Sequence, residues 1–203
     1  MKKAQQKYEK AKGIFREHGG ILKASDAIRE RIHPRTLYEM RDKGIVEVLS
    51  RGLYRLADLR PLSNQDLITV ALRIPNGVVC LISALAFHDL TTQVPHEVYI
   101  AVERISRLPK VDYPPVRVFR FTEGAFKTGI ESHNTEGVPL RVYSPEKTIA
   151  DCFKYRNKIG LDTAIEALRL YRERKHFKID DLMRFGGVCR VEKVMRPYLE
   201  ALL

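Results

Sequence analysis

The sequence lacks an apolar stretch long enough to cross a bilayer. Its longest run without a charged side chain covers residues 74–87, 14 positions that include Pro75, Asn76 and Gly77, whereas a membrane-spanning helix needs about 20 predominantly apolar residues. The amino terminus is polar and rich in lysine, and no apolar block with a small-residue cleavage site follows it. We therefore expect a cytoplasmic protein that does not enter a membrane.

Cysteine is also scarce. Cys80, Cys152 and Cys189 lie far apart, each among apolar neighbours, and the sequence contains neither a Cys-x-x-Cys pair nor a histidine at zinc-ligand spacing. This pattern argues against a disulfide framework and against a zinc site. It predicts buried, reduced thiols in a protein that needs no metal and no cofactor.

The sequence motifs of several enzyme classes are missing. No Gly-x-Ser-x-Gly elbow, phosphate-binding glycine loop or His-Glu-x-x-His occurs. The only Glu-x-Lys, at residues 173–175, falls in a helical pattern, whereas metal-dependent nucleases of that type need the pair on a strand beside an aspartate. The adjacent His88 and Asp89 follow an apolar helical segment and are explained by hydrogen bonds at a helix end. We assign no catalytic residue and predict that the protein is not an enzyme.

Positive charge, by contrast, is abundant. The 203 residues include 36 Lys and Arg against 25 Asp and Glu, a net charge of +11, and the apolar and charged fractions of 44% and 30% are those of a globular protein. Residues 1–60 contain 15 of the basic residues and 8 of the acidic ones. Such an excess attracts nucleic acid, anionic lipid or an acidic partner, and most of it lies in the first third of the chain.

The order of predicted elements in this first third is that of a winged helix-turn-helix. A helix through residues 8–18 is ended by Gly19 and Gly20, and a short extended piece follows. Ser25 is expected to cap a second helix that runs to Arg31, and Pro34 to begin a third that ends before Gly44. Residues 45–49 and 52–56 then form two short strands joined by a glycine-containing turn, which predicts a β-hairpin.

The helix that begins at Pro34 is the candidate recognition helix, because the second helix of a helix-turn-helix enters the major groove of DNA. Arg35 and Thr36 lie in its first turn and are expected to reach base edges, while Arg41 and Lys43 are expected to contact phosphate. Arg51, at the tip of the hairpin, is placed to reach the DNA backbone or a narrow minor groove. The predicted DNA-binding residues are Arg35, Thr36, Tyr38, Arg41, Lys43 and Arg51.

Two other interpretations of this helix stay open. Glu39 and Asp42 lower the local positive potential, and a helix face with this composition is often merely solvated. Small three-helix units with a hairpin also serve as modules that bind protein or RNA. A further basic segment, with Arg104, Arg107 and Lys110, is either a solvated loop or a second basic surface that continues from the winged helix.

The rest of the chain predicts an α+β domain, a small sheet backed by helices. Pro61 ends the first pattern, which places the boundary between domains 1–60 and 61–203. Ser63 with Asp66 is expected to cap a helix that runs to about residue 73, and residues 78–90 to form a buried helix. Strands follow at 96–102, 116–121 and within 126–143, and helical stripes at 148–153, 161–174 and 188–202. Ser144 is expected to cap the first of these helices, with Asp151 on its outer side, close to Lys147, Lys154 or Tyr155.

Three segments together resemble the AbiEi antitoxin family of bacterial abortive-infection systems. They are "SRGLYRL" at 50–56, "ISALAFHDLTTQVPHEVYIAV" at 82–102 and "YSPEKTIADCFKYRNKIGLDTAIEALR" at 143–169, and "SPEKTIADCFKYR" is the most specific of their elements. The resemblance implies a winged-helix transcriptional repressor of its own operon with a carboxy-terminal antitoxin domain. It places the DNA contacts on the recognition helix and the hairpin.

The resemblance also implies a partner. The family is paired with a nucleotidyltransferase-like toxin in type IV toxin-antitoxin systems, in which neutralisation does not require a stable complex. We expect double-stranded DNA of the chain's own promoter as the main ligand, with a repeated or palindromic site bound by two copies. Direct contact with the toxin and the mechanism of the carboxy-terminal domain stay open.

Overall fold

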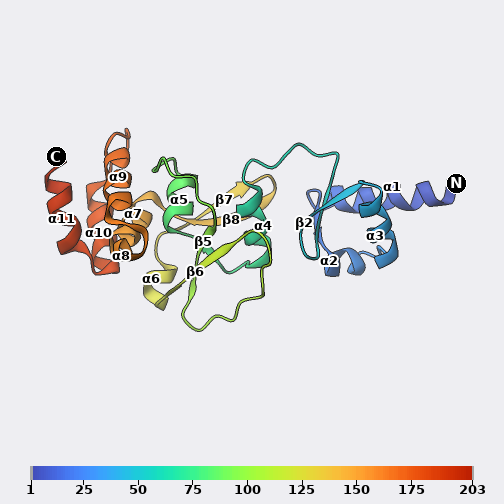
Figure 1. The fold of residues 1–203 in the computed structure, drawn as a ribbon, viewed down its shortest axis with the longest axis horizontal. Coiled ribbons are helices and arrows are strands. Elements are labelled where there is room, and N and C mark those ends of the chain that lie inside the picture. The colour runs from blue at the N-terminus through green and yellow to red at the C-terminus, as the bar shows by residue number, and fades with distance from the viewer. Residues whose placement is uncertain (1, 203) are drawn as a thin grey trace.

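The structure is a computed structural model that describes residues 2–202. The molecule is elongated, with the first helix at one end, a sheet in the middle and a group of helices at the carboxy-terminal end (Figure 1). Among the described residues, no helix combines the length and the apolar character that crossing a bilayer requires.

Residues 2–56 form a winged helix-turn-helix, as predicted. The three strands form an antiparallel sheet in the order β1-β3-β2. The helices pack on it through a shared apolar core that includes Phe15, Leu37, Met40 and Leu56. The elements are α1 (Lys2–Glu17), β1 (Ile21–Lys23), α2 (Ala24–Arg29), α3 (Pro34–Asp42), β2 (Val46–Ser50) and β3 (Leu53–Leu56).

Local signals decide most of these boundaries. Gly20 has a φ of +83°, and its N–H donates to the carbonyl of Phe15, which closes the end of α1. Pro34 is the first residue of α3, where a missing N–H costs nothing. Gly52, with a φ of +73°, turns the chain between β2 and β3. The hairpin formed by β2 and β3 is called the wing below.

The predicted cap at Ser25 is wrong, because α2 begins one residue earlier. The N–H of Ala24, the first residue of α2, donates to the carbonyl of Gly52 in the wing at 2.8 Å, so a partner distant in sequence satisfies one of the free N–H groups at the start of the helix. The helix also ends at Arg29, before the predicted end at Arg31, which has a left-handed φ of +63°.

The second part of the chain is an α+β structure built on a mixed sheet in the order β6-β5-β4-β8-β7. The pairs β5–β6 and β4–β8 are parallel and the other pairs are antiparallel. Helices α7 to α11 gather beyond one end of this sheet (Figure 1). The elements up to the last strand are α4 (Gln65–Arg73), β4 (Val78–Val79), α5 (Leu81–Phe87), β5 (Val98–Glu103), β6 (Val116–Phe121), α6 (Glu123–Lys127), β7 (Ile130–Thr135) and β8 (Val138–Tyr143).

The helical end consists of α7 (Pro145–Lys154), α8 (Arg156–Ile159), α9 (Leu161–Arg172), α10 (Ile179–Cys189) and α11 (Glu192–Glu200). Ser144 caps α7 as predicted, since its hydroxyl accepts from the N–H of Lys147 at 3.3 Å. The predicted outward position of Asp151 is wrong: Asp151 is completely buried and forms an ion pair with Lys147.

Three other boundaries differ from the predictions. Ser63 does not cap α4, because its N–H and hydroxyl both donate to the carboxylate of Glu136 in the turn between β7 and β8, at 2.8 and 2.6 Å. The predicted helix over 78–90 begins only at Leu81, since Val78 and Val79 form the short central strand β4. The stripe over 188–202 is divided between two helices at Arg190, which has a left-handed φ of +59°.

The two parts of the chain contact each other through an apolar cluster. Leu49 and Leu53 of the winged helix pack with Ile68 of α4 and Val138 of β8. The side chain of Arg73 adds a hydrogen bond from its Nη1 to the carbonyl of Arg51 in the wing, at 3.0 Å. A domain boundary near residue 60, between domains 1–60 and 61–203, stays a prediction.

Candidate nucleic-acid interface

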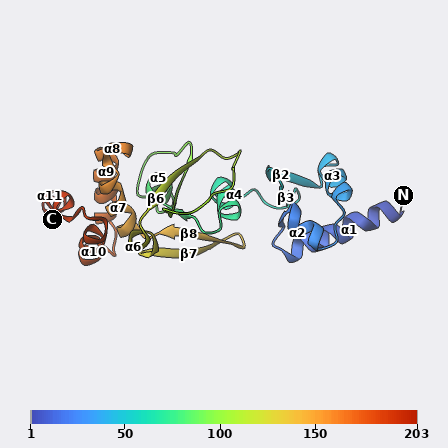
Figure 2. The ribbon, with the colours of Figure 1, turned by 90° about the horizontal axis from the view of Figure 1, so that it is seen from below.

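The outer face of α3 is exposed, and five of the six predicted DNA-binding residues lie on it or at its end. The side chain of Arg35 is 84% exposed, and Tyr38 is 51% exposed. Arg41 and Lys43 are also exposed, and Thr36 is half-buried. The helix lies on the side of the winged helix away from the central sheet (Figure 2), so this face is open to a ligand as large as a duplex.

The inner face of the same helix fixes this orientation. Leu37 and Met40 are buried, with exposures of 2% and 0%, in the core that α1 and the small sheet share. At the start of α3, Nδ1 of His33 accepts a hydrogen bond from the N–H of Arg35 at 3.2 Å and so caps the helix. The capping histidine was not predicted from the sequence, in which only Pro34 marked this helix start.

Glu39 is the centre of a small ionic network on this face. Its carboxylate accepts hydrogen bonds from Lys7 of α1, from the hydroxyl of Tyr8 at 2.8 Å and from Nε of Arg35 at 3.2 Å. Hydrogen bonding to Lys7 is the largest cause that lowers the pKa of Glu39 to about 2. The carboxylate is therefore ionised at any physiological pH, and it joins α1 to α3.

A second ion pair occupies the end of the helix. Nε and Nη2 of Arg41 both donate to Oδ1 of Asp42, at 2.9 and 2.7 Å, and the Arg41 guanidinium lies 5.4 Å from the centre of the Tyr38 ring. The ammonium of Lys43 lies 5.0 Å from the ring of Tyr8. Because these pairs are exposed, they contribute little stability and their cations can exchange a carboxylate for a phosphate at small cost.

Basic residues of α1 and of the turn before α3 extend this surface. A shallow cleft of about 140 Å³ lies between these elements, and its lining includes Lys7, Lys10, Arg31, His33 and Thr36. None of the lining residues is acidic. Sequence reasoning missed the contribution of Lys7 and Lys10, since the side of α1 that meets α3 depends on tertiary packing.

Arg51 occupies the tip of the wing, as predicted, and is exposed. Its guanidinium forms no hydrogen bond or ion pair with any side chain among residues 5–202. Its carbonyl is held by Arg73 of α4, whose Nη2 also donates to the carbonyl of Lys110 at 3.1 Å. The wing tip therefore lies beside the basic segment that the sequence showed at residues 104–110.

In the second part of the chain, His88 and its neighbours were the residues that most suggested catalysis in the sequence. Nε2 of His88 bonds to the carbonyl of Tyr143 at 2.8 Å, and Arg174 donates to the carbonyl of His88, so this histidine serves hydrogen bonding at the end of α5, as predicted. Burial lowers the pKa of His88, which keeps the ring neutral. Among the described residues, no group of three or more His, Cys, Asp or Glu side chains is placed to hold a metal ion.

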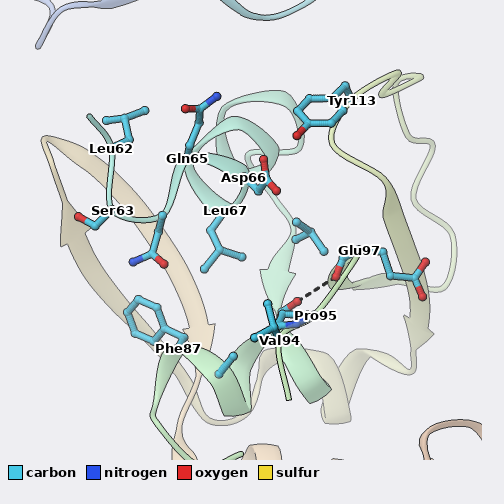
Figure 3. A pocket seen from close by; sticks show the side chains of 14 residues that line it. Leu62, Ser63, Gln65, Asp66, Leu67, Phe87, Val94, Pro95, Glu97 and Tyr113 are labelled. Carbon is cyan, nitrogen blue, oxygen red and sulfur yellow. Dashed lines mark hydrogen bonds between the residues drawn. The ribbon is translucent and has the colours of Figure 1, made fainter. Parts of the chain in front are cut away.

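The cleft in Figure 3 lies in the second part of the chain. It has a volume of about 470 Å³ between the start of α4, α5 and the chain before β5, and its lining includes no histidine or cysteine. The hydroxyl of Ser83 accepts from the N–H of Tyr99 at 2.9 Å, and Glu97 pairs with Arg117 at 3.3 Å. Ser83 and Glu97 thus have structural partners.

Comparisons with known proteins agree with the winged helix. Residues 11–57 match the family described as "Transcriptional regulator, AbiEi antitoxin", which is a regulatory family and not an enzyme family. A comparison with curated protein sequences gives no significant match. Among solved structures, the crystal structure of the RV2827C protein from Mycobacterium tuberculosis is similar over 94% of this chain and 79% of that chain, with a TM-score of 0.57 and 14% sequence identity. At this identity the likeness shows a shared fold alone.

Proposed function

We propose, on the premise that residues 11–57 have the fold and sequence of an AbiEi antitoxin regulator, that this chain binds the promoter of its own toxin-antitoxin operon and represses it. The observation that supports this proposal best is the exposed basic face of α3, to which the exposed Arg51 at the tip of the wing adds a further cation. A major groove admits one α-helix, and a face of this kind supplies donors for both base edges and phosphates.

The six residues then have distinct roles. Arg35 and Thr36, in the first turn of α3, face base edges, and Tyr38 packs against the groove wall. Arg41 and Lys43, at the end of the helix, bind phosphate, and Arg51 contacts the neighbouring backbone or minor groove. The basic cleft between α1 and α3 provides a further phosphate contact through Lys7 and Lys10.

Two copies are expected on each operator. A single winged helix contacts few base pairs, so pairing on a repeated or palindromic site multiplies specificity. The protein would act in the cytoplasm as the antitoxin of a nucleotidyltransferase-like toxin, with or without direct contact. No catalytic step is part of this proposal, and supercoiled DNA incubated with the protein and Mg²⁺ is expected to stay intact.

The test is a gel shift with the DNA directly upstream of the gene, at low and at high salt. Binding should fall steeply as salt rises, because each contact between a basic residue and a phosphate releases counterions. No shift at low salt would remove the proposal. A stoichiometric protein or RNA partner that co-purifies in place of DNA would favour the alternative, a winged-helix module that binds protein or RNA.

Replacement of Arg35 by alanine separates base contact from phosphate contact. If Arg35 contacts a base, R35A should cost roughly 1 to 3 kcal/mol on the operator and much less on random DNA. Arg172→Ala is the matched control, since it removes one exposed positive charge from α9, far from the winged helix. Equal losses of R35A on both kinds of DNA would reassign Arg35 to a phosphate.

A further inference from the structure

The connection between β5 and β6 is a long segment that two arginine side chains hold in place. Nη1 of Arg120, on β6, donates to the carbonyls of Arg104 and Ser106 at 3.0 and 2.9 Å. At the other end, Arg73 of α4 donates to the carbonyl of Lys110 at 3.1 Å. Both clamps bind backbone atoms, so they fix the course of the segment and leave its side chains free.

The aliphatic side chains of this segment differ in their exposure. Leu108 and Val111 pack against the apolar cluster that contains Ile74 and Val102. Ile105, by contrast, is 89% exposed, the most exposed of the large hydrophobic residues described. The segment therefore packs Leu108 and Val111 partly against the core, whereas Ile105 points into solvent at a turn whose backbone is held by Arg120.

The cations beside Ile105 are also free. Arg104 and Arg107 are exposed, and neither has a carboxylate within ion-pair distance among residues 5–202. Lys110 is 90% exposed in its side chain, although Asp112 lies 3.3 Å from its ammonium. The tip is therefore an aliphatic side chain flanked by two unpaired guanidinium groups.

The position of the segment relates it to the proposed DNA surface. Because Arg73 bonds to the carbonyls of both Arg51 and Lys110, the start of the wing turn and the end of the basic segment share one bridging side chain. The segment and α3 lie on the same side of the molecule, toward the top of Figure 2. The apolar cluster of Leu53, Ile68 and Val138 holds the two parts of the chain in this arrangement.

We propose that residues 104–110 form a second DNA-contacting element, in which Ile105 inserts into the minor groove next to the site of α3 while Arg104 and Arg107 bind the flanking phosphates. The inference rests on the proposed function. An α-helix in the major groove leaves the adjacent minor groove to a more distant part of the protein. An aliphatic side chain between arginines is the kind of wedge that unstacks a base step and bends the duplex.

The experiment measures binding and bending of the upstream DNA separately. The duplex has a fluorophore at each end, so energy transfer reports the bend, and anisotropy reports the affinity. Ile105→Ala should leave a bound complex whose bend is smaller by about 20° or more. Val94→Ala, which shortens another exposed aliphatic residue in a loop of the second part, should leave the bend unchanged.

The arginines are tested through the salt dependence of binding. The double variant R104A/R107A should lower the slope of log affinity against log salt by about 1.8, which is two phosphate contacts at about 0.9 each. R172A should leave the slope as it is in the wild type. All of these positions are exposed, so unchanged thermal unfolding is expected and confirms that each variant is folded.

The outcomes distinguish this inference from the proposed function. If the wild-type protein does not bind the duplex, the proposed function fails, and this inference fails with it. If the wild type binds but I105A bends DNA equally and R104A/R107A keeps its slope, only the second element is refuted. If the wild-type protein bound vesicles of anionic phospholipid and I105A did not, while I105A bent DNA like the wild type, the tip would be assigned to a membrane surface. That result would overturn the inference.

Discussion

Replacement of Lys147 by methionine should destabilise the protein strongly, because it leaves a carboxylate alone in the core. Lys147 and Asp151 are both completely buried, one turn apart in α7, with 2.5 Å between Nζ and Oδ2. The other oxygen of Asp151 accepts from the thiol of Cys189 at 3.1 Å, and the ring of Tyr143 lies 4.2 Å from the ammonium. Removal of one partner from such a pair typically costs about 3 to 5 kcal/mol.

The cost should depend on pH in a defined direction. Burial raises the pKa of Asp151 above its ordinary value, and the ammonium of Lys147 opposes that rise. An acid whose pKa is higher in the folded state favours folding below its unfolded pKa, and this contribution is lost as the pH rises through the folded pKa. In K147M the opposing ammonium is gone, so the pKa of Asp151 rises further. The free energy of unfolding then continues to fall up to a higher pH.

Urea unfolding of the wild type and K147M, at about pH 5 and about pH 7, measures both effects. K147M should lose more stability at the higher pH. The double variant K147M/D151L should recover most of the loss, because it removes the buried carboxylate together with its partner. A penalty below about 1 kcal/mol for K147M, equal at both pH values, would refute this account of the pair.

Three further predictions concern other parts of the molecule. Gly129→Ala should lower the free energy of unfolding by about 2 kcal/mol or more, measured in urea, since Gly129 has a φ of +77° and a Cβ there would lie 2.8 Å from Cβ of Lys147. Glu39→Gln should tighten binding to operator and to random DNA alike in anisotropy titrations, because a carboxylate that stays ionised repels phosphate; weaker binding would contradict this. The native protein should resist a thiol reagent that labels all three cysteines after unfolding, since burial raises the pKa of each thiol; the three are Cys80, Cys152 and Cys189.

The winged helix was predictable because its signals are local. Gly20 ends α1, Pro34 begins α3 and Gly52 turns the wing, and in each case the residue acts on its own backbone or on the adjacent turn. The exposure of the basic side of α3 followed from the spacing of Leu37 and Met40 in the same way. Local chemistry alone was sufficient for these features.

The errors arise where a partner distant in sequence competes with a local one. Ser63 is a good capping residue, but Glu136 accepts both of its hydrogen bonds. Asp151 was predicted to face outward because a charged residue beside an apolar stripe usually faces solvent. In the structure α7 is buried on nearly every side, and Lys147 neutralises the charge of Asp151. The clamp formed by Arg73 is invisible in the sequence for the same reason, since its acceptors lie 22 and 37 residues away.

The contact between the two parts of the chain determines how a long DNA surface can work. When two binding elements are joined by a flexible connection, binding of both loses conformational entropy. Elements held in a fixed geometry avoid most of that loss. Here Ile68 and Val138 pack against the small sheet, and Arg73 bonds to both the wing and the basic segment. The spacing between α3 and Ile105 is therefore set by folding. On the function and the second element proposed above, the protein would select DNA that can bend to meet both elements, so base pairs that neither element touches would contribute to specificity through their deformability.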